Sequence, residues 1–90
     1  MKRLHALFSG MVQGVGFRYT TERIARHFQV TGFVKNLRDG RVEVVAEGEE
    51  QELKDFLSAI REGELGSTIR DLEIEWETAR GTYDKFGVAF

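Results

Sequence analysis

Apolar and polar residues alternate along several short runs of the chain, and in two longer stretches apolar residues recur every three or four positions. Strict alternation is typical of strands with one buried face, and the longer spacing is typical of helices that pack one face against a core. The pattern predicts five strands, over about residues 3–11, 33–37, 41–47, 68–79 and 86–90. It also predicts two helices, one that follows a turn at residues 12–18 and reaches about residue 30, and one that begins at Gly48 and ends at Gly63 and Gly66.

This order of elements is typical of an α+β protein with the ferredoxin-like βαββαβ split sandwich. In that fold two helices cover one face of an antiparallel sheet, and here a short extra strand follows at the C-terminus. Because a helix joins the first two strands, we expect them to run parallel with the third strand between them. Their C-terminal ends then lie at the same edge of the sheet, about two strand spacings (~10 Å) apart. The turn at residues 12–18 and the strand-end residue Asn36 can therefore meet around one small ligand.

Three local signals refine these elements. Thr31 and Gly32 are expected to end the first helix, since glycine commonly follows a helix C-terminus. Asp39-Gly40 lies between two β-prone runs and is expected to form a hairpin turn with positive φ at both positions. In the fourth strand, three apolar residues alternate with three acidic ones: Leu72, Ile74 and Trp76 with Glu73, Glu75 and Glu77. We expect these glutamates to form a solvated sheet face and not an acidic metal site.

The composition limits the classes of partner. Ninety residues are enough for one domain, over residues 1–90. The formal net charge of −2 and the pI of about 5.7 argue against nucleic acid as a partner. No run approaches the ~18 apolar residues of a membrane span. The absence of cysteine excludes disulfides, thiolate metal sites and a cysteine nucleophile. We therefore expect a cytoplasmic protein with neither a nucleic-acid nor a membrane partner.

Residues 10–18, Gly-Met-Val-Gln-Gly-Val-Gly-Phe-Arg, are the strongest candidate for a functional site. A glycine-containing turn between a strand and a helix N-terminus lets backbone N–H groups converge on an anion, and Arg18 adds a guanidinium suited to phosphate oxygens. Together with Asn36, this set supplies no nucleophile and no strong base, since we interpret His5 and His27 as surface or boundary residues. Such a site suits an already activated substrate, for example an acyl phosphate attacked by a water molecule that Asn36 holds.

Two segments of the chain resemble the signatures of the acylphosphatase family: Val12–Arg18 (Val-Gln-Gly-Val-Gly-Phe-Arg) and Thr31–Val45. The resemblance covers nearly the whole chain, and Gly10 matches a family glycine that precedes the first signature. It implies hydrolysis of acyl phosphates to a carboxylate and inorganic phosphate by a monomer, without a metal or an organic cofactor. It also implies that Arg18 and Asn36 are the catalytic residues, with Asn36 orienting the attacking water. The phosphoryl-binding residues that it implies are Gln13, Gly14, Val15, Gly16, Phe17 and Arg18.

Three alternatives remain open at this point. A non-catalytic phosphate- or metabolite-binding module on the same fold would use the turn and Arg18 but would not need Asn36. An RNA-binding module would need exposed aromatic and basic residues on the third strand, which reads Arg-Val-Glu-Val-Val-Ala-Glu and offers no such set. Similar domains also begin larger carbamoyl-transferring maturation proteins, although the end of the chain at residue 90 favours a stand-alone enzyme. For Gln13, the sequence leaves open whether the side chain acts on the substrate or only braces the loop.

Overall fold

The computed structural model describes all residues from Met1 to Phe90. Both helices are too short and too polar to cross a membrane. The helices are α1 (Phe17–Ala25) and α2 (Glu50–Glu62), and a short 3-10 helix, η1 (Gly66–Thr68), precedes the fourth strand. The strands are β1 (Lys2–Gly10), β2 (Thr31–Asn36), β3 (Val42–Gly48), β4 (Ile69–Thr78) and β5 (Phe86–Ala89).

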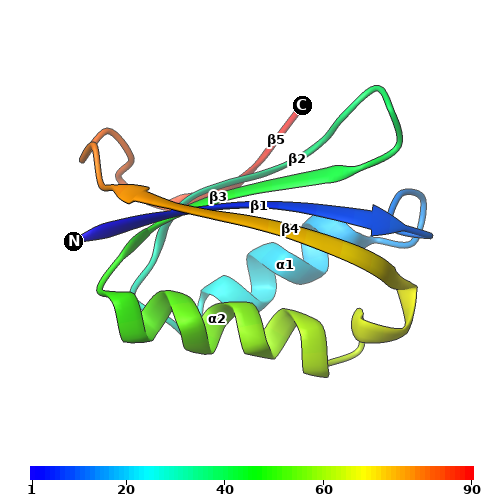
Figure 1. Ribbon diagram of the computed structural model, residues 1–90, viewed down its shortest axis with the longest axis horizontal. Coiled ribbons are helices and arrows are strands. Elements are labelled where there is room, and N and C mark those ends of the chain that lie inside the picture. The colour runs from blue at the N-terminus through cyan, green and yellow to red at the C-terminus, as the bar shows by residue number, and fades with distance from the viewer.

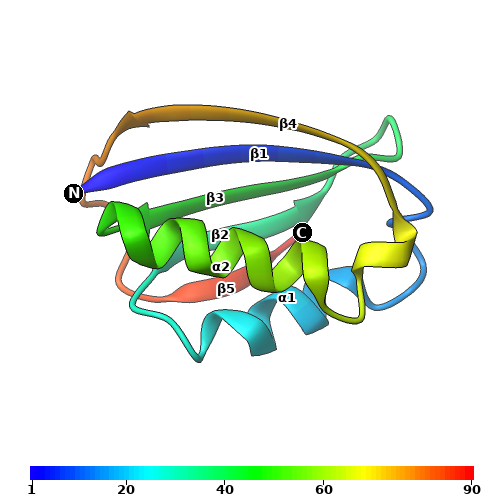
Figure 2. The same cartoon turned by 60° about the horizontal axis from the view of Figure 1, so that its bottom comes forward.

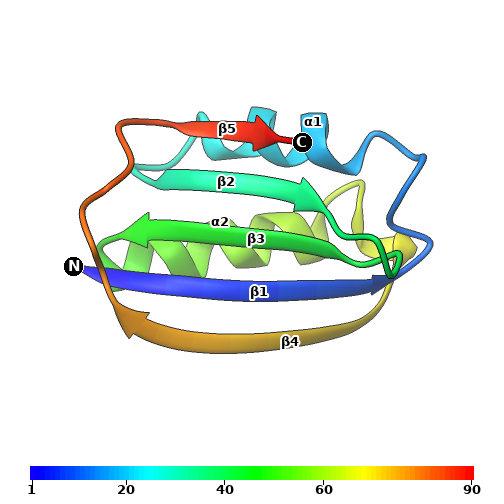
Figure 3. The ribbon, with the colours of Figure 1, turned by 90° about the horizontal axis from the view of Figure 1, so that it is seen from above.

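The strands form one sheet in the order β4-β1-β3-β2-β5, as Figure 3 shows from the open side of the sheet. β3 pairs antiparallel with both β1 and β2, so β1 and β2 run parallel and end at the same edge. The predicted ferredoxin-like order is therefore confirmed. The sheet is mixed and not purely antiparallel, because β5 pairs parallel with β2.

Both helices lie on one face of the sheet, and the main core fills the space between the two layers (Figures 1 and 2). From the sheet, alternate residues of β1 point into this core: Leu4, Ala6 and Phe8 are fully buried. From α2 the core receives residues at the predicted helical spacing, namely Leu53, Phe56, Leu57 and Ile60. Burial of each large side chain contributes roughly 1.5–3 kcal/mol, so this layer of contacts is the main source of stability.

The edge strand β4 follows the predicted alternation but is only partly covered. Its glutamates face solvent on the open side, as expected. Trp76 and Ile74 pair with Leu4 and Ala6 and therefore share the helix-side face, yet they remain 42% and 37% exposed. The apolar pattern of β4 correctly indicates which face of the strand points toward the helices. These residues stay partly exposed because an edge strand has a neighbouring strand on one side only and the helices cover the centre of the sheet.

Two local predictions were wrong. α1 ends at Ala25, and Gly32 lies inside β2 opposite Ala46 instead of ending the helix. The apolar spacing continues to Phe28, which packs against the core from a non-helical turn, so the periodicity overstated the length of the helix. The Asp39-Gly40 turn does close the hairpin between β2 and β3, but only Gly40 has positive φ, at 96°.

On the open face, the buried carboxylate of Glu47 holds the segment between β4 and β5. Glu47 Oε2 accepts hydrogen bonds from the Arg80 amide (2.8 Å) and from Arg3 Nη1 (3.2 Å), and Oε1 accepts one from the Gly81 amide (3.0 Å). Burial raises the pKa of Glu47, but the hydrogen bonds from Arg80, Gly81 and Arg3 outweigh that effect and leave the pKa below its ordinary value of 4.5.

We expect Glu47→Gln to lower the free energy of unfolding at pH 7 by roughly 1–3 kcal/mol, because the charged acceptor of three donors is lost. Since the folded-state pKa is depressed, the carboxylate stabilises the fold above its ordinary pKa, and this contribution disappears as the pH falls through the folded-state value. Urea denaturation of both proteins between pH 7 and strongly acidic pH measures the difference, which should shrink toward low pH. Glu75→Gln, on the same face but exposed, is the control and should change little. Equal stability of Glu47→Gln and wild type at pH 7 would contradict the assignment.

Candidate active site

The turn between β1 and α1, residues 11–16, is here called the cradle loop. Within it Gly14 and Gly16 have φ of 79° and 77°, whereas no non-glycine residue of the chain has a positive φ. The sign of φ therefore alternates through Gly14, Val15 and Gly16. Such alternation turns successive backbone N–H groups toward one side and forms a concavity for an anion. A Cβ atom at either glycine would meet nothing within 4 Å, so glycine is needed here for the backbone angle and not for space.

The cradle loop leads directly into the N-terminus of α1. Gly16 is the N-cap and provides no side-chain cap, and no acidic residue occupies the first turn. The amides of residues 13–18 donate no hydrogen bond to another main-chain group. Unsatisfied amides at a helix N-terminus carry partial positive charge, and an anion is their usual partner.

A cavity of about 140 Å³ opens at this point, lined by Val12, Gly14, Gly16, Phe17, Arg18, Tyr19 and Asn36. It brings together most of the predicted site residues, and it joins the start of α1 to the end of β2 as the topology required. Gln13 and Val15 belong to the cradle loop, but their side chains do not line the cavity. Tyr19 lines it although the sequence analysis did not single it out. In the sequence, the signal that Tyr19 could belong to the site was its position directly after Arg18.

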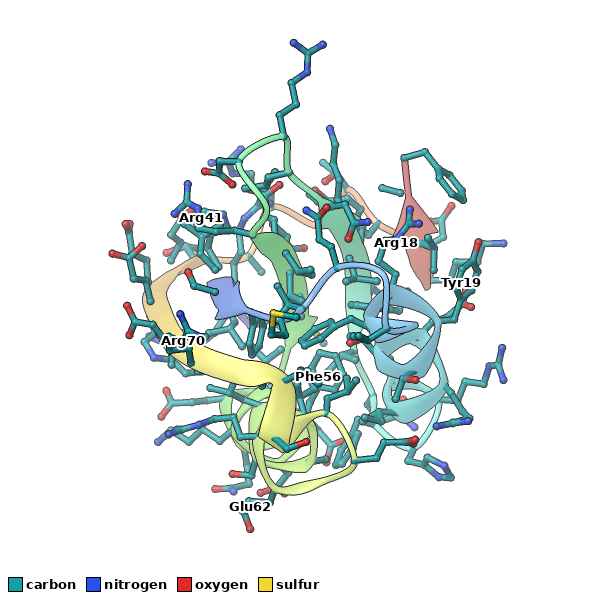
Figure 4. The ribbon with its side chains drawn as sticks, turned by 90° about the vertical axis from the view of Figure 1, so that its right-hand side faces the viewer. Arg18, Tyr19, Arg41, Phe56, Glu62 and Arg70 are labelled. Atoms are coloured by element: carbon teal, nitrogen blue, oxygen red, sulfur yellow. The ribbon has the colours of Figure 1, made fainter.

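Arg18 has no carboxylate within salt-bridge distance. Its guanidinium carbon instead lies 4.9 Å from the centroid of the Phe90 ring and 5.8 Å from that of Tyr19. Figure 4 shows Arg18 and Tyr19 on neighbouring positions beside the cradle loop. Contact with an aromatic face attracts a guanidinium but uses none of its N–H donors. Arg18 is thus held at the cavity with its charge unneutralised and its donors available.

Gln13 connects the cradle loop to the β2–β3 hairpin. Its Nε2 donates to the carbonyl oxygens of Leu37 (2.7 Å) and Arg41 (3.0 Å). Both acceptors lie just beyond Asn36, at the two ends of the hairpin loop. Of the two roles that the sequence left open, the geometry favours bracing, since both N–H donors of the side chain are engaged by the protein itself.

The base of the cradle loop is fixed against β4. A Cβ at Gly10 would lie 2.5 Å from the Thr68 carbonyl oxygen and 2.7 Å from the Arg70 amide nitrogen. The Met11 amide donates to that same carbonyl of Thr68 over 2.9 Å. Close backbone approach therefore requires glycine at position 10. The loop is held on one side by β4 and on the other by Gln13.

A larger cavity, of about 480 Å³, lies at the opposite end of the molecule, between the end of α1 and the start of β5. Its charged lining residues are of both signs: Glu22, Glu47 and Asp84 with Arg26 and Lys85. Size alone would favour this cavity, but the amides without a main-chain acceptor, the unpaired Arg18 and Asn36 lie at the cradle loop.

Comparisons with known proteins give the family and the fold to which this chain is similar. The family model described as acylphosphatase matches residues 4–88. A protein named acylphosphatase from Archaeoglobus fulgidus is 47% identical over 90 residues, which is the whole of both chains. The crystal structure of acylphosphatase from Bacillus subtilis aligns over 100% of both chains with a TM-score of 0.91 and 34% identity. The crystal structure of T. kodakarensis HypF aligns with a TM-score of 0.84 and 33% identity, over 100% of this chain and 12% of that one.

We expect Gln13→Leu to lower the free energy of unfolding by roughly 1–2 kcal/mol, because it removes two hydrogen bonds between the cradle loop and the hairpin. Binding of inorganic phosphate should weaken as well, since the loop is then less well ordered. Urea denaturation and a phosphate titration measure the two effects. The matched control is Gln51→Leu, which removes an exposed contact with Asp55 on α2 and should leave both quantities near wild type. If Gln13→Leu behaves like that control, Gln13 does not brace the loop.

Proposed function

The chain belongs to the acylphosphatase family of hydrolases, and we propose that it hydrolyses the carboxyl–phosphate bond of small acyl phosphates without a metal ion. The proposal treats residues 1–90 as one catalytic domain. The observation that supports it is one small cavity lined by Gly14 and Gly16 of the cradle loop, by Arg18 and by Asn36, beside amides that have no main-chain acceptor. The products are a carboxylate and inorganic phosphate.

In this proposal the phosphoryl group occupies the cradle loop. The amides of residues 13–18 donate to its nonbridging oxygens, and Arg18 adds a two-pronged contact with full positive charge. These donors are fixed by the backbone before the substrate arrives, so little reorganisation is needed when charge develops on the phosphoryl oxygens. Phosphoryl transfer depends mainly on such positioning and charge stabilisation, which is why a site of this size can suffice.

The attacking group is a water molecule oriented by the side-chain oxygen of Asn36. Asn36 ends β2, lines the cavity, and its side chain makes no hydrogen bond within the protein that would compete with this role. The oxygen of the water forms the new bond to phosphorus while the bond from phosphorus to the acyl oxygen breaks, and the carboxylate leaves with that electron pair. The proton of the water passes to a phosphate oxygen, so no separate base is required.

We expect Asn36→Ala to lower kcat for benzoyl phosphate by roughly a hundredfold or more, because the water is no longer oriented, while inhibition by inorganic phosphate stays near wild type. Steady-state kinetics with excess chelator measure both quantities. If Asn36→Ala turns over substrate at the wild-type rate, Asn36 is not needed. If neither protein turns over substrate although phosphate still binds, the protein is a phosphate-binding module. Loss of wild-type activity in chelator that a divalent ion restores would show that the reaction needs a metal.

Arg18→Ala should lose turnover and phosphate inhibition together, each by roughly a hundredfold or more, since the same guanidinium contacts the phosphoryl group of substrate and product. Arg18→Lys keeps the charge but not the planar pair of donors, and should recover only part of the loss. Arg38→Ala is the matched control, because Arg38 is exposed in the β2–β3 hairpin and does not line the cavity. The role of Arg18 would be refuted by phosphate inhibition that persists in Arg18→Ala.

A further inference from the structure

The arginines of this chain fall into two groups. One group has a carboxylate within salt-bridge distance: Arg3, Arg23, Arg26, Arg41 and Arg80. The other group has none and consists of Arg18, Arg38, Arg61 and Arg70. All four of these lie at the end of the molecule where β1 and β2 finish: at the start of α1, in the β2–β3 hairpin, at the end of α2 and at the start of β4. Although the net charge is −2, the unneutralised guanidinium groups are concentrated at one end.

Two of these arginines share a cavity that does not belong to the cradle loop. This cavity has a volume of about 370 Å³ and is lined by Arg61, Gly66, Ile69, Arg70, Asp71 and Leu72. The turn at Gly66 folds back tightly on the end of α2, and a Cβ there would lie 2.2 Å from the Arg61 carbonyl oxygen. That fold-back brings the last turn of α2 beside the first residues of β4, and so places both guanidinium-bearing side chains around one opening.

The acidic groups nearby form no salt bridge with this pair. Asp71 also lines the cavity, so the lining carries two positive charges and one negative charge; its Oδ1 accepts a hydrogen bond from the Leu72 amide over 2.9 Å. Glu62, the neighbour of Arg61 in sequence, points away from Arg70 toward the far side of α2 (Figure 4). The two arginines outnumber the one carboxylate, and the excess positive charge around one cavity favours an added anion. A tetrahedral oxyanion presents several acceptors to two such groups at once.

From this arrangement we propose that Arg61 and Arg70 form a second oxyanion-binding site, which takes a phosphate-sized dianion. The site is separate from the cradle loop. β4 and β2 are three strand spacings apart, about 14 Å, and Figure 4 shows Arg70 and Arg18 on opposite sides of the cradle loop. A small acyl phosphate in the cradle loop does not reach it, so the second site binds a separate anion.

The test is a titration of the whole protein with inorganic phosphate, followed by NMR through the side-chain Nε–H signals of the arginines. The signals of Arg61 and Arg70 should shift together with one dissociation constant, independently of the signal of Arg18. Arg61→Gln and Arg70→Gln should each weaken that second binding event by roughly tenfold or more, since each removes charge-assisted hydrogen bonds. Neither variant should change turnover of benzoyl phosphate or the response of Arg18.

Arg38 is the matched control, because it is exposed and unpaired at the same end of the molecule but lines no cavity. If its signal follows phosphate with the same affinity as those of Arg61 and Arg70, the effect is general attraction by positive charge and the site does not exist. The proposal also fails if Arg61 and Arg70 show no response up to about 50 mM phosphate, well above the millimolar range of a weak specific site. Because Arg18 has its own signal, failure at the cradle loop is seen separately from failure here.

Discussion

Because β3 runs between β1 and β2 and pairs antiparallel with each, β1 and β2 end at the same edge of the sheet, two strand spacings apart. This single constraint decides what can meet at that edge. The loop after β1 supplies free main-chain amides and Arg18, and the last residue of β2 supplies Asn36. The gap between the ends of β1 and β2 is about 10 Å, too wide for the end of either strand alone to enclose a phosphoryl group. A loop that follows β1 and turns back over this gap can enclose one. Gln13 connects that loop to the hairpin beyond β2 through two hydrogen bonds.

Charged side chains are arranged differently on the open face of the sheet and at the edge that carries the cradle loop. On the open face of the sheet, Arg3 forms a salt bridge with Glu47, and the His5 ring forms a hydrogen bond with Glu43. At the edge that carries the cradle loop, Arg18 is held by aromatic rings. A salt bridge would have fixed the side chain equally well but would have neutralised it and occupied its donors. A cation at a helix N-terminus is unfavourable in an empty site, since the helix dipole presents positive charge there. The buried core is therefore the main source of stability, while the guanidinium of Arg18 has no carboxylate partner at the edge that carries the cradle loop.

The sequence predicted those features that depend on local pattern and connectivity. Alternation in β1 and the spacing in α2 identified the core faces, and chain order alone was enough to place Asn36 beside the cradle loop. Features set by packing between distant segments could not be foreseen. The sequence could not show that Gln13 reaches the carbonyls of the hairpin, that Phe90 lies over Arg18, or that a tight turn brings Arg61 and Arg70 to one cavity. The error in the predicted C-terminal end of α1 has a related cause. Phe28 belongs to the core and so continues the apolar spacing after the helix has ended.

The lining of the small cavity also bears on which bonds the proposed mechanism could break. It contains no carboxylate, imidazole or thiol, and it presents amides, a guanidinium and a carboxamide to the phosphoryl group. Such a set stabilises negative charge and orients water, and apart from the phenol of Tyr19 its members do not donate a proton to a departing oxygen. A carboxylate leaves as a stable anion and needs no such proton, whereas an alkoxide from an ordinary phosphate ester does. On this mechanism, discrimination between acyl phosphates and phosphate esters arises from the basicity of the leaving group more than from its shape. The acyl side of the substrate can then vary widely while the phosphoryl side stays fixed.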